Sequence, residues 1–114
     1  MTADGFEDVA ALASVPPGAQ HCVVVGGRPV LVCRDARDGR VWAVHNSCPH
    51  AFQPLTGGAL RDGTLLCPKH GACFELATGR SLNAVTPRPL AVFGVRIEGE
   101  RVLVSSQPLA TATS

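Results

Sequence analysis

Short apolar segments separated by glycine, proline and acidic residues run along most of the chain. Near the C-terminus, Phe93, Val95 and Ile97 alternate with smaller or polar residues, and the turn sequence Glu-Gly-Glu follows at 98–100. Alternation with a period of two is typical of a strand buried on one face. The pattern predicts strands at residues 21–25, 30–33, 41–44, 65–66, 73–76, 93–97 and 102–104. Short strands spaced by about eight to twelve residues predict an all-β fold, a small antiparallel barrel or sandwich.

Turn signals and the ends of the chain complete this outline. Residues 26–29, Gly-Gly-Arg-Pro, predict a short hairpin loop, and Asp62-Gly63 predicts a further turn. Residues 8–13 favour a single helical turn. Because the last residues are small and polar, we expect one domain over residues 1–114, with a core at about 6–105 and a flexible tail at 106–114.

The composition agrees with a strand-rich core and restricts the function classes. Valine, which favours strands, occurs 14 times and isoleucine once. The net charge of +1 gives no basic field for a phosphate backbone, so we expect no nucleic-acid partner. No apolar run approaches the roughly 18 residues that a membrane helix needs. The first eight residues are acidic where a signal peptide would be basic. We therefore expect a cytoplasmic protein without a membrane segment.

The candidate chemistry lies in a stretch at residues 45–68 that departs from the strand pattern. Cys48-Pro49-His50 opens it, and Cys67-Pro68-Lys69-His70-Gly71 follows after 16 intervening residues. Each segment offers one thiolate and one imidazole, and the proline biases the preceding cysteine away from a helix. Two such loops brought together would present four metal ligands, Cys48, His50, Cys67 and His70.

The number of ligands alone leaves the metal open. Two thiolates and two imidazoles suit a single tetrahedral zinc ion. They also suit an iron–sulfur cluster in which two histidines replace two cysteines on one iron. Zinc fingers usually pair Cys with Cys and then His with His. Here each loop gives one Cys and one His, so each loop could reach both irons of a two-iron cluster.

The remaining cysteines and histidines are interpreted as ordinary residues. Cys22 and Cys33 lie in apolar predicted strands, where they could face each other across the first hairpin, and Cys73 begins a strand. Free cysteine is among the most buried residue types, and a reducing cytosol disfavours a disulfide. His21 is interpreted as a plain polar side chain. His45 lies close enough to the first loop that it either supports a ligand or is equally plain.

The two loops and their flanks resemble the Rieske signature. The flanking sequences agree with that family at residues 41–47 and 55–58 around the first loop and at 74–79 after the second. The resemblance extends from about residue 23 to about residue 104. In size, the chain resembles the soluble Rieske-type ferredoxins that serve bacterial oxygenases. The family implies one 2Fe-2S cluster, with Cys48 and Cys67 on the inner iron and His50 and His70 on the outer iron.

The resemblance implies an electron carrier and not an enzyme. The carrier would take single electrons from a flavin-containing reductase to a terminal aromatic-ring-hydroxylating oxygenase, and we expect a monomer. The alternatives are the small subunit of a nitrite or similar reductase and a structural zinc module. An oxygenase would need a mononuclear iron held by two histidines and a carboxylate. Only His21 and His45 would remain for that iron.

Four residues depart from the high-potential members of this family. Gln53 and Lys69 stand where respiratory Rieske proteins carry the cysteines of a disulfide between the two loops. Ala72 and Phe74 stand where those proteins place serine and tyrosine donors, and neither has a hydroxyl. With fewer donors to sulfur, we expect a potential toward the low end of the Rieske range of about −150 to +300 mV.

Two further features bear on a bound cluster. Gly71 follows the last ligand and would permit close backbone approach to the cluster sulfides, although a simple turn glycine explains it equally well. Residues 87–89, Pro-Arg-Pro, resemble the proline-containing loop that covers the third side of the cluster in this family.

Overall fold

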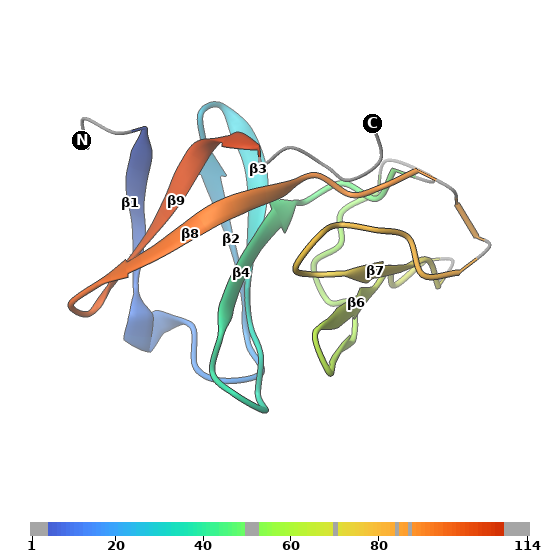
Figure 1. The fold of residues 1–114 in the computed structure, drawn as a ribbon, viewed down its shortest axis with the longest axis horizontal. Coiled ribbons are helices and arrows are strands. Elements are labelled where there is room, and N and C mark those ends of the chain that lie inside the picture. Colours follow the sequence, from blue (N-terminus) through green and yellow to red (C-terminus); the bar gives the residue numbers. More distant parts are fainter. Residues whose placement is uncertain (1–4, 50–52, 70, 84, 87, 109–114) are drawn as a thin grey trace.

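Residues 5–49, 53–69, 71–83, 85–86 and 88–108 are described by a computed structural model, and they form nine strands and one short 3-10 helix (Figure 1). In chain order the elements are β1 (Phe6–Ala11), η1 (Leu12–Ser14), β2 (Gln20–Val25), β3 (Arg28–Arg34), β4 (Val41–His45), β5 (Leu60–Arg61), β6 (Thr64–Leu66), β7 (Cys73–Glu75), β8 (Val92–Glu98) and β9 (Arg101–Pro108).

The larger of two sheets is antiparallel and has the strand order β1-β9-β8-β4-β3-β2. Its edge strands, β1 and β2, contact each other. Where they meet, the backbone N–H of Gly26 donates a hydrogen bond of 3.1 Å to the Glu7 carboxylate. The sheet therefore curls into a nearly closed barrel, at the left of Figure 1. The predicted all-β antiparallel architecture is confirmed.

The smaller sheet has the order β5-β6-β7 and lies beside the barrel, at the right of Figure 1. β5 and β6 pair from Leu60↔Leu65 to Arg61↔Thr64, so the connecting turn is Asp62-Gly63, as predicted. Both turn residues have positive φ, 51° and 75°. A two-residue turn with two positive φ angles matches the twist of the strands that it joins.

The first hairpin is tighter than the sequence indicated. β2 and β3 pair out to Val25↔Arg28, so the loop consists only of Gly26 and Gly27, and residues 28 and 29 already belong to β3. The same register places Cys22 opposite Leu31 and Cys33 opposite Gln20. The two cysteines therefore do not face each other across the hairpin.

The predicted helical turn at residues 8–13 is wrong. β1 occupies Phe6–Ala11 and pairs with β9, with a register shift between Asp8 and Ala10. The 3-10 turn begins only at Leu12. Residues 6–11 are extended because they pair with β9, a strand some 90 residues further along the chain. An ion pair also joins these two strands, with 2.7 Å between the Asp8 Oδ1 and a guanidinium nitrogen of Arg101.

Two apolar clusters fill the interior. One lies within the barrel and consists largely of valines, namely Val15, Val25, Val30, Val32, Val102 and Val104 together with Ala43 and Phe93. The other joins residues of the barrel, such as Leu31 and Val44, to residues of the smaller sheet, such as Leu65 and Phe74. This second cluster fixes the smaller sheet against the barrel.

Along the chain, residues 46–91 connect β4 to β8, which are neighbouring strands of the barrel, and they include the smaller sheet. β4 and β8 pair at Ala43↔Phe93 and Val44↔Val92. One residue further on, the His45 N–H donates to the Ala91 carbonyl at 2.9 Å. Both ends of this long excursion are thus held at the same place on the barrel rim.

The C-terminal strand runs past the predicted edge of the core. β9 continues to Pro108, three residues beyond position 105, and residues 109–114 lie outside the described residues. Within the described part of the chain, no helix has the length and apolar character needed to cross a membrane.

Candidate metal centre

The first loop leaves the barrel directly after β4 and carries Cys48. The Cys48 N–H donates to the Gln53 carbonyl at 2.8 Å, which closes the loop on itself. The Cys48 side chain is fully buried. His50, the other predicted ligand of this loop, lies outside the described residues.

The second loop, between β6 and β7, repeats this closure. The Cys67 N–H donates to the Ala72 carbonyl at 2.7 Å, again five residues further along the chain. Gly71 donates back to the Cys67 carbonyl at 3.1 Å and has a φ of +77°, a conformation that favours glycine. Gly71 is therefore required by the turn. His70 lies outside the described residues.

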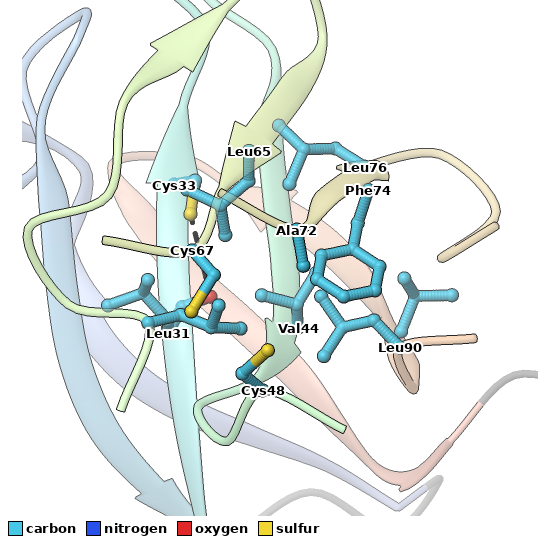
Figure 2. Packing of buried hydrophobic residues seen from close by; sticks show 12 residues of the cluster. Leu31, Cys33, Val44, Cys48, Leu65, Cys67, Ala72, Phe74, Leu76 and Leu90 are labelled. Carbon is cyan, nitrogen blue, oxygen red and sulfur yellow. Dashed lines mark hydrogen bonds between the residues drawn. The ribbon is translucent and has the colours of Figure 1, made fainter. Parts of the chain in front are cut away.

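The two cysteines come together in the apolar cluster between the barrel and the smaller sheet. Cys48 and Cys67 are 0 % and 2 % exposed, and both belong to this cluster. Figure 2 shows the two side chains between Leu31 and Val44 of the barrel, with Ala72 nearby. The prediction that the two loops meet is thus supported for their cysteines.

Positions 72 and 74, beside the two thiols, carry no side chain that can donate a hydrogen bond. Ala72 and Phe74 are both fully buried in the cluster that holds Cys48 and Cys67. Neither residue can donate a hydrogen bond from its side chain. An apolar environment of this kind also keeps water away from the sulfur atoms.

A third thiol shares the same cluster. Cys33 is fully buried, and its thiol points to the Leu31 carbonyl at 3.9 Å, a weak contact for a weak donor. Burial raises the pKa of the Cys33 thiol to about 12. Cys33 is therefore a neutral packing residue at neutral pH, as the sequence indicated.

The returning arm of the first loop is held by Asn46, whose role the sequence analysis did not identify. The Asn46 Oδ1 accepts a hydrogen bond of 2.7 Å from the buried Leu55 N–H. Its Nδ2 donates to the Thr56 hydroxyl at 2.9 Å and to the Cys22 sulfur at 3.3 Å. One side chain at the end of β4 thereby satisfies backbone and side-chain groups of residues 55–56.

Gln20 fixes the next two residues of the same arm. The Gly57 N–H donates to the Gln20 Oε1 at 2.8 Å, and the Gln20 Nε2 donates to the Gly58 carbonyl. Gln20 is 37 residues away in sequence, so no local signal could have identified it. Gly58 in turn lies directly on the chain that leads to Cys67, because a Cβ built there would sit 2.0 Å from the Leu66 carbonyl oxygen.

A third segment, residues 83–91, adjoins both loops. The Asn83 amide donates to the Gly71 carbonyl at 2.9 Å. Ser47 and Pro49 of the first loop share a small pocket of about 170 Å³ with Pro89 and His45. Pro89 of the predicted proline-containing loop thus lies beside the first loop, while Pro87 lies outside the described residues.

His45 lines this pocket together with Leu90 and Ala91. Burial, followed by the charge of Arg28, lowers the pKa of the His45 imidazole below its usual 6.5. A neutral imidazole is therefore favoured there. Its backbone N–H, bonded to Ala91, holds the third segment at the barrel rim.

Two cysteine assignments need comment. Cys22 is exposed, and the interpretation of Cys22 as a buried packing residue is wrong. Its side chain alternates to the outer face of β2 and meets Asn46 there. Cys73 is half-buried on β7, opposite Leu66. Among the residues that the structure describes, no three His, Cys, Asp or Glu side chains gather around one point, and both predicted imidazole ligands lie outside that set.

Comparison with known proteins decides the family. Residues 6–94 match the Rieske [2Fe-2S] domain. The chain belongs to the Rieske family. Membership implies one Rieske-type 2Fe-2S cluster.

Rieske relatives match most of this chain. The ferredoxin component of the naphthalene 1,2-dioxygenase system of Pseudomonas aeruginosa is 31 % identical over 97 residues, which cover 85 % of this chain and 91 % of the relative. The ferredoxin component of biphenyl 2,3-dioxygenase from Rhodococcus jostii is 35 % identical over 88 residues, 77 % of this chain and 80 % of the relative. Both relatives are electron-transfer components and not catalytic subunits.

Solved Rieske structures agree with these relatives. A chain in the complex of reduced oxygenase and oxidized ferredoxin in carbazole 1,9a-dioxygenase has a TM-score of 0.83 at 28 % identity, covering 93 % of this chain and 97 % of that chain. A Mycobacterium tuberculosis protein described as an NADH-dependent nitrite reductase small subunit has a TM-score of 0.79, covering 88 % of this chain and 93 % of its own. At 24 % identity, the second likeness shows the fold alone.

The described residues fit a Rieske cluster. Cys48 and Cys67 bring two thiols from two equally closed loops into one water-shielded cluster. At Gly71, no described residue other than its chain neighbours places an atom within 4 Å of the position that a Cβ would take.

Proposed function

We propose that this protein is a soluble Rieske ferredoxin that carries single electrons from a flavin-containing reductase to a terminal aromatic-ring-hydroxylating oxygenase. The observation that carries the proposal is the meeting of Cys48 and Cys67, from two loops closed in the same way, inside one apolar cluster. Family membership and the near-full-length likeness to ferredoxin components support it.

Within this proposal, four side chains hold the cluster. Cys48 and Cys67 would bind one iron through their thiolates, and His50 and His70 would bind the other iron through imidazole nitrogen. When bound, the cluster supplies a one-electron redox centre. The chain contributes buried apolar contacts around the thiolates and fixed backbone at residues 46–58, where Asn46 and Gln20 hold the loop.

The reduction potential lies toward the low end of the Rieske range. Ala72 and Phe74, both buried beside the two cysteines, offer no hydroxyl to stabilise the additional negative charge of the reduced state. A redox titration that gave a midpoint above about +100 mV would contradict this part of the proposal.

The decisive experiment is electron paramagnetic resonance of the dithionite-reduced protein, together with iron and acid-labile sulfide analysis. We expect a rhombic signal with a low average g value, which reports mixed histidine and cysteine ligation. His70→Ala should abolish that signal, and the matched control His21→Ala should retain it. A colourless protein that binds zinc after anaerobic reconstitution would overturn the proposal, as would an unchanged spectrum in the His70→Ala protein.

Partner assays separate the remaining functional alternative. We propose that a flavin-containing reductase reduces the protein and that the oxygenase component reoxidises it, with the protein acting as a monomer in the cytoplasm. The exposed thiol of Cys22 suits a reducing compartment. Stable co-purification with a large sirohaem subunit would favour a nitrite reductase small subunit instead. Sedimentation analysis would test the monomer.

A further inference from the structure

Three segments surround the end of the molecule where Cys48 and Cys67 lie. We call the surface formed by the described residues of three segments, 46–58, 67–72 and 83–91, the site end; residues 50–52, 70, 84 and 87 lie outside the described set. Gly58 of the first segment packs on Leu66, the residue directly before the second segment. The third segment is tied to the other two through the Asn83–Gly71 hydrogen bond and the pocket beside Pro49. Across all three segments the formally charged residues are Lys69 and Arg88, and no aspartate or glutamate occurs.

Both cationic side chains of the site end are available to a partner. Lys69, in the second loop, and Arg88, in the third segment, are exposed. Neither takes part in an ion pair with another described residue. Arg37 and Arg101 differ, since Arg37 lies 3.6 Å from Asp35 and Arg101 lies 2.7 Å from Asp8. Arg28, Arg61 and Arg80 are exposed and likewise form no ion pair with a described residue, but they lie outside the three segments. The site end therefore presents two exposed positive charges, Lys69 in the second loop and Arg88 in the third segment.

The acidic residues lie elsewhere. In the barrel, carboxylates are found on β1, in the β3–β4 loop and at the β8–β9 turn, namely Glu7, Asp8, Asp35, Asp38, Glu98 and Glu100. The β8–β9 turn lies at the opposite end of the long axis from the smaller sheet (Figure 1). In the smaller sheet, Asp62 faces Arg37 at 3.8 Å, and Glu75 accepts a hydrogen bond from Thr78.

Salt screening weakens the effect of the carboxylates at the β8–β9 turn on a partner bound at the site end. The molecule is 39 Å along its longest axis. The Debye length at physiological ionic strength is about 8 Å, so charges at the far end of the barrel are largely screened from a partner at the site end. The carboxylates at the β8–β9 turn (Figure 1), Glu98 and Glu100, therefore offset little of the positive charge that such a partner meets.

We propose that the electron acceptor of this protein presents an acidic docking surface to the site end, opposite Lys69 and Arg88. The proposal rests on the electron-carrier function and adds the charge of the partner surface. Electron-transfer contacts are small and brief, and complementary charge acts mainly on the rate of association. A basic acceptor surface would be repelled by the same two side chains.

Two small outer-sphere oxidants of opposite charge test the field at the site end. The trivalent anion hexacyanoferrate(III) and the trivalent cation tris(phenanthroline)cobalt(III) each take one electron from the dithionite-reduced protein, and their metal ion becomes divalent. Stopped-flow rates give the ratio of the anion rate constant to the cation rate constant. A variant that shifts the reduction potential alters both driving forces, so the ratio isolates the electrostatic effect.

The variants are Lys69→Glu and Arg88→Glu, with Glu100→Lys as the matched control at the far end of the barrel. Each reversal at the site end should lower the anion rate and raise the cation rate, each by roughly fivefold for a trivalent probe about 8 Å away at physiological salt. The ratio should therefore fall by more than tenfold. In the double variant Lys69→Glu/Glu100→Lys, which keeps the net charge, the ratio should stay as low as in Lys69→Glu alone.

The same variants are then compared with a protein acceptor, native cytochrome c with its basic surface and its succinylated, acidic form. The wild-type protein should reduce the acidic form faster, with a rate that falls as salt is added, and Lys69→Glu should reverse this preference. A ratio that is unchanged in both site-end variants, or that follows the net charge in the double variant, would overturn the acidic-partner inference while leaving the carrier function intact. Failure of every oxidant to take an electron from wild-type protein would instead refute the carrier function.

Discussion

Gly58 provides the sharpest test of how the two cysteine loops are joined. A Cβ at this position would lie 2.0 Å from the Leu66 carbonyl oxygen and 3.1 Å from the Leu55 carbonyl oxygen. Both obstacles are backbone atoms, so no side-chain rotation can relieve the overlap. The φ angle of Gly58 is not in the left-handed region, so alanine adds no backbone strain there. Any loss of stability in Gly58→Ala therefore comes from the steric clash of its Cβ.

The magnitude follows from the displacement that an alanine requires. An ordinary carbon–oxygen contact is about 3.3 Å, so Leu66 would have to move away by more than 1 Å. Forcing an additional methyl group into a packed site costs about 1–3 kcal/mol. The neighbouring hydrogen bond from the Leu66 N–H to the Ala59 carbonyl, 3.0 Å long, would weaken at a further cost of about 1 kcal/mol. We therefore expect Gly58→Ala to destabilise the protein by about 3 kcal/mol.

Gly57→Ala is the matched control, because the two glycines are adjacent but differ in what constrains them. Gly57 has a φ of +90°, and among the described residues only its chain neighbours come within 4 Å of a built Cβ, so alanine there adds left-handed strain of roughly 1–2 kcal/mol. The assay is thermal unfolding of the cluster-loaded protein by far-ultraviolet circular dichroism, with bleaching of visible absorption followed in parallel. At about 4–8 °C per kcal/mol for a domain of this size, Gly58→Ala should melt at least 10 °C below the wild type. It should also lose its colour faster than Gly57→Ala, since Leu66 directly precedes Cys67. Equal midpoints and equal bleaching rates in the two variants would refute the close-approach argument.

Three further substitutions test the surroundings of the site. Phe74→Tyr should raise the reduction potential if its hydroxyl reaches a sulfur atom. The rise should be about 40 mV for each ~1 kcal/mol by which the new hydrogen bond favours the reduced state. An unchanged midpoint potential in potentiometric titration would contradict the missing-donor explanation. Asn46→Leu should lower the free energy of unfolding by about 3 kcal/mol in urea titrations, because the buried Leu55 N–H loses its acceptor, and retention of wild-type stability would count against this anchoring role. For His45, burial and Arg28 lower the pKa below 6.5, so the unfolded chain binds more protons and stability should fall as the pH drops through that value. His45→Gln should remove this contribution, seen by comparing urea midpoints at about pH 5.5 and about pH 7.5, and an unaltered slope would show that the imidazole does not titrate differently on folding.

Most of the strands could be predicted because valine and leucine alternate with polar residues where a strand has one buried face. Phe93, Val95 and Ile97 show the alternation in sequence, and β8 contains them, although burial follows the length of the strand and not one face: Phe93 is buried, Val95 is half-buried and Ile97 is exposed. The first strand could not be predicted in this way. Its sequence, Phe-Glu-Asp-Val-Ala-Ala, lacks the alternation, and β1 exists because β9 supplies its hydrogen-bonding partners from the other end of the chain.

The same division holds at the site. Cys48 and Cys67 could be recognised because proline and histidine accompany each of them at matched spacing, and their burial together supports that prediction. Gln20 could not be recognised, since its amide reaches Gly57 and Gly58 only after β2 has been folded against the loop. The exposure of Cys22 could not be predicted, because the uninterrupted apolar run of residues 22–25 does not reveal which face of the strand is covered; on β2, Cys22 and Val24 are exposed and Val25 is buried.

The pairing of β4 with β8 has a consequence for how such proteins diversify. Residues 46–91 leave β4 and rejoin the sheet at β8 at neighbouring pairing positions, Val44↔Val92 and His45–Ala91. The pairing of the two barrel strands therefore does not depend on how long the segment between them is. Lengthening such an excursion adds little entropic cost, because the loss grows only with the logarithm of its length. The redox portion can therefore gain or lose residues, or be grafted onto another hairpin whose ends are similarly spaced, while the host scaffold keeps its register.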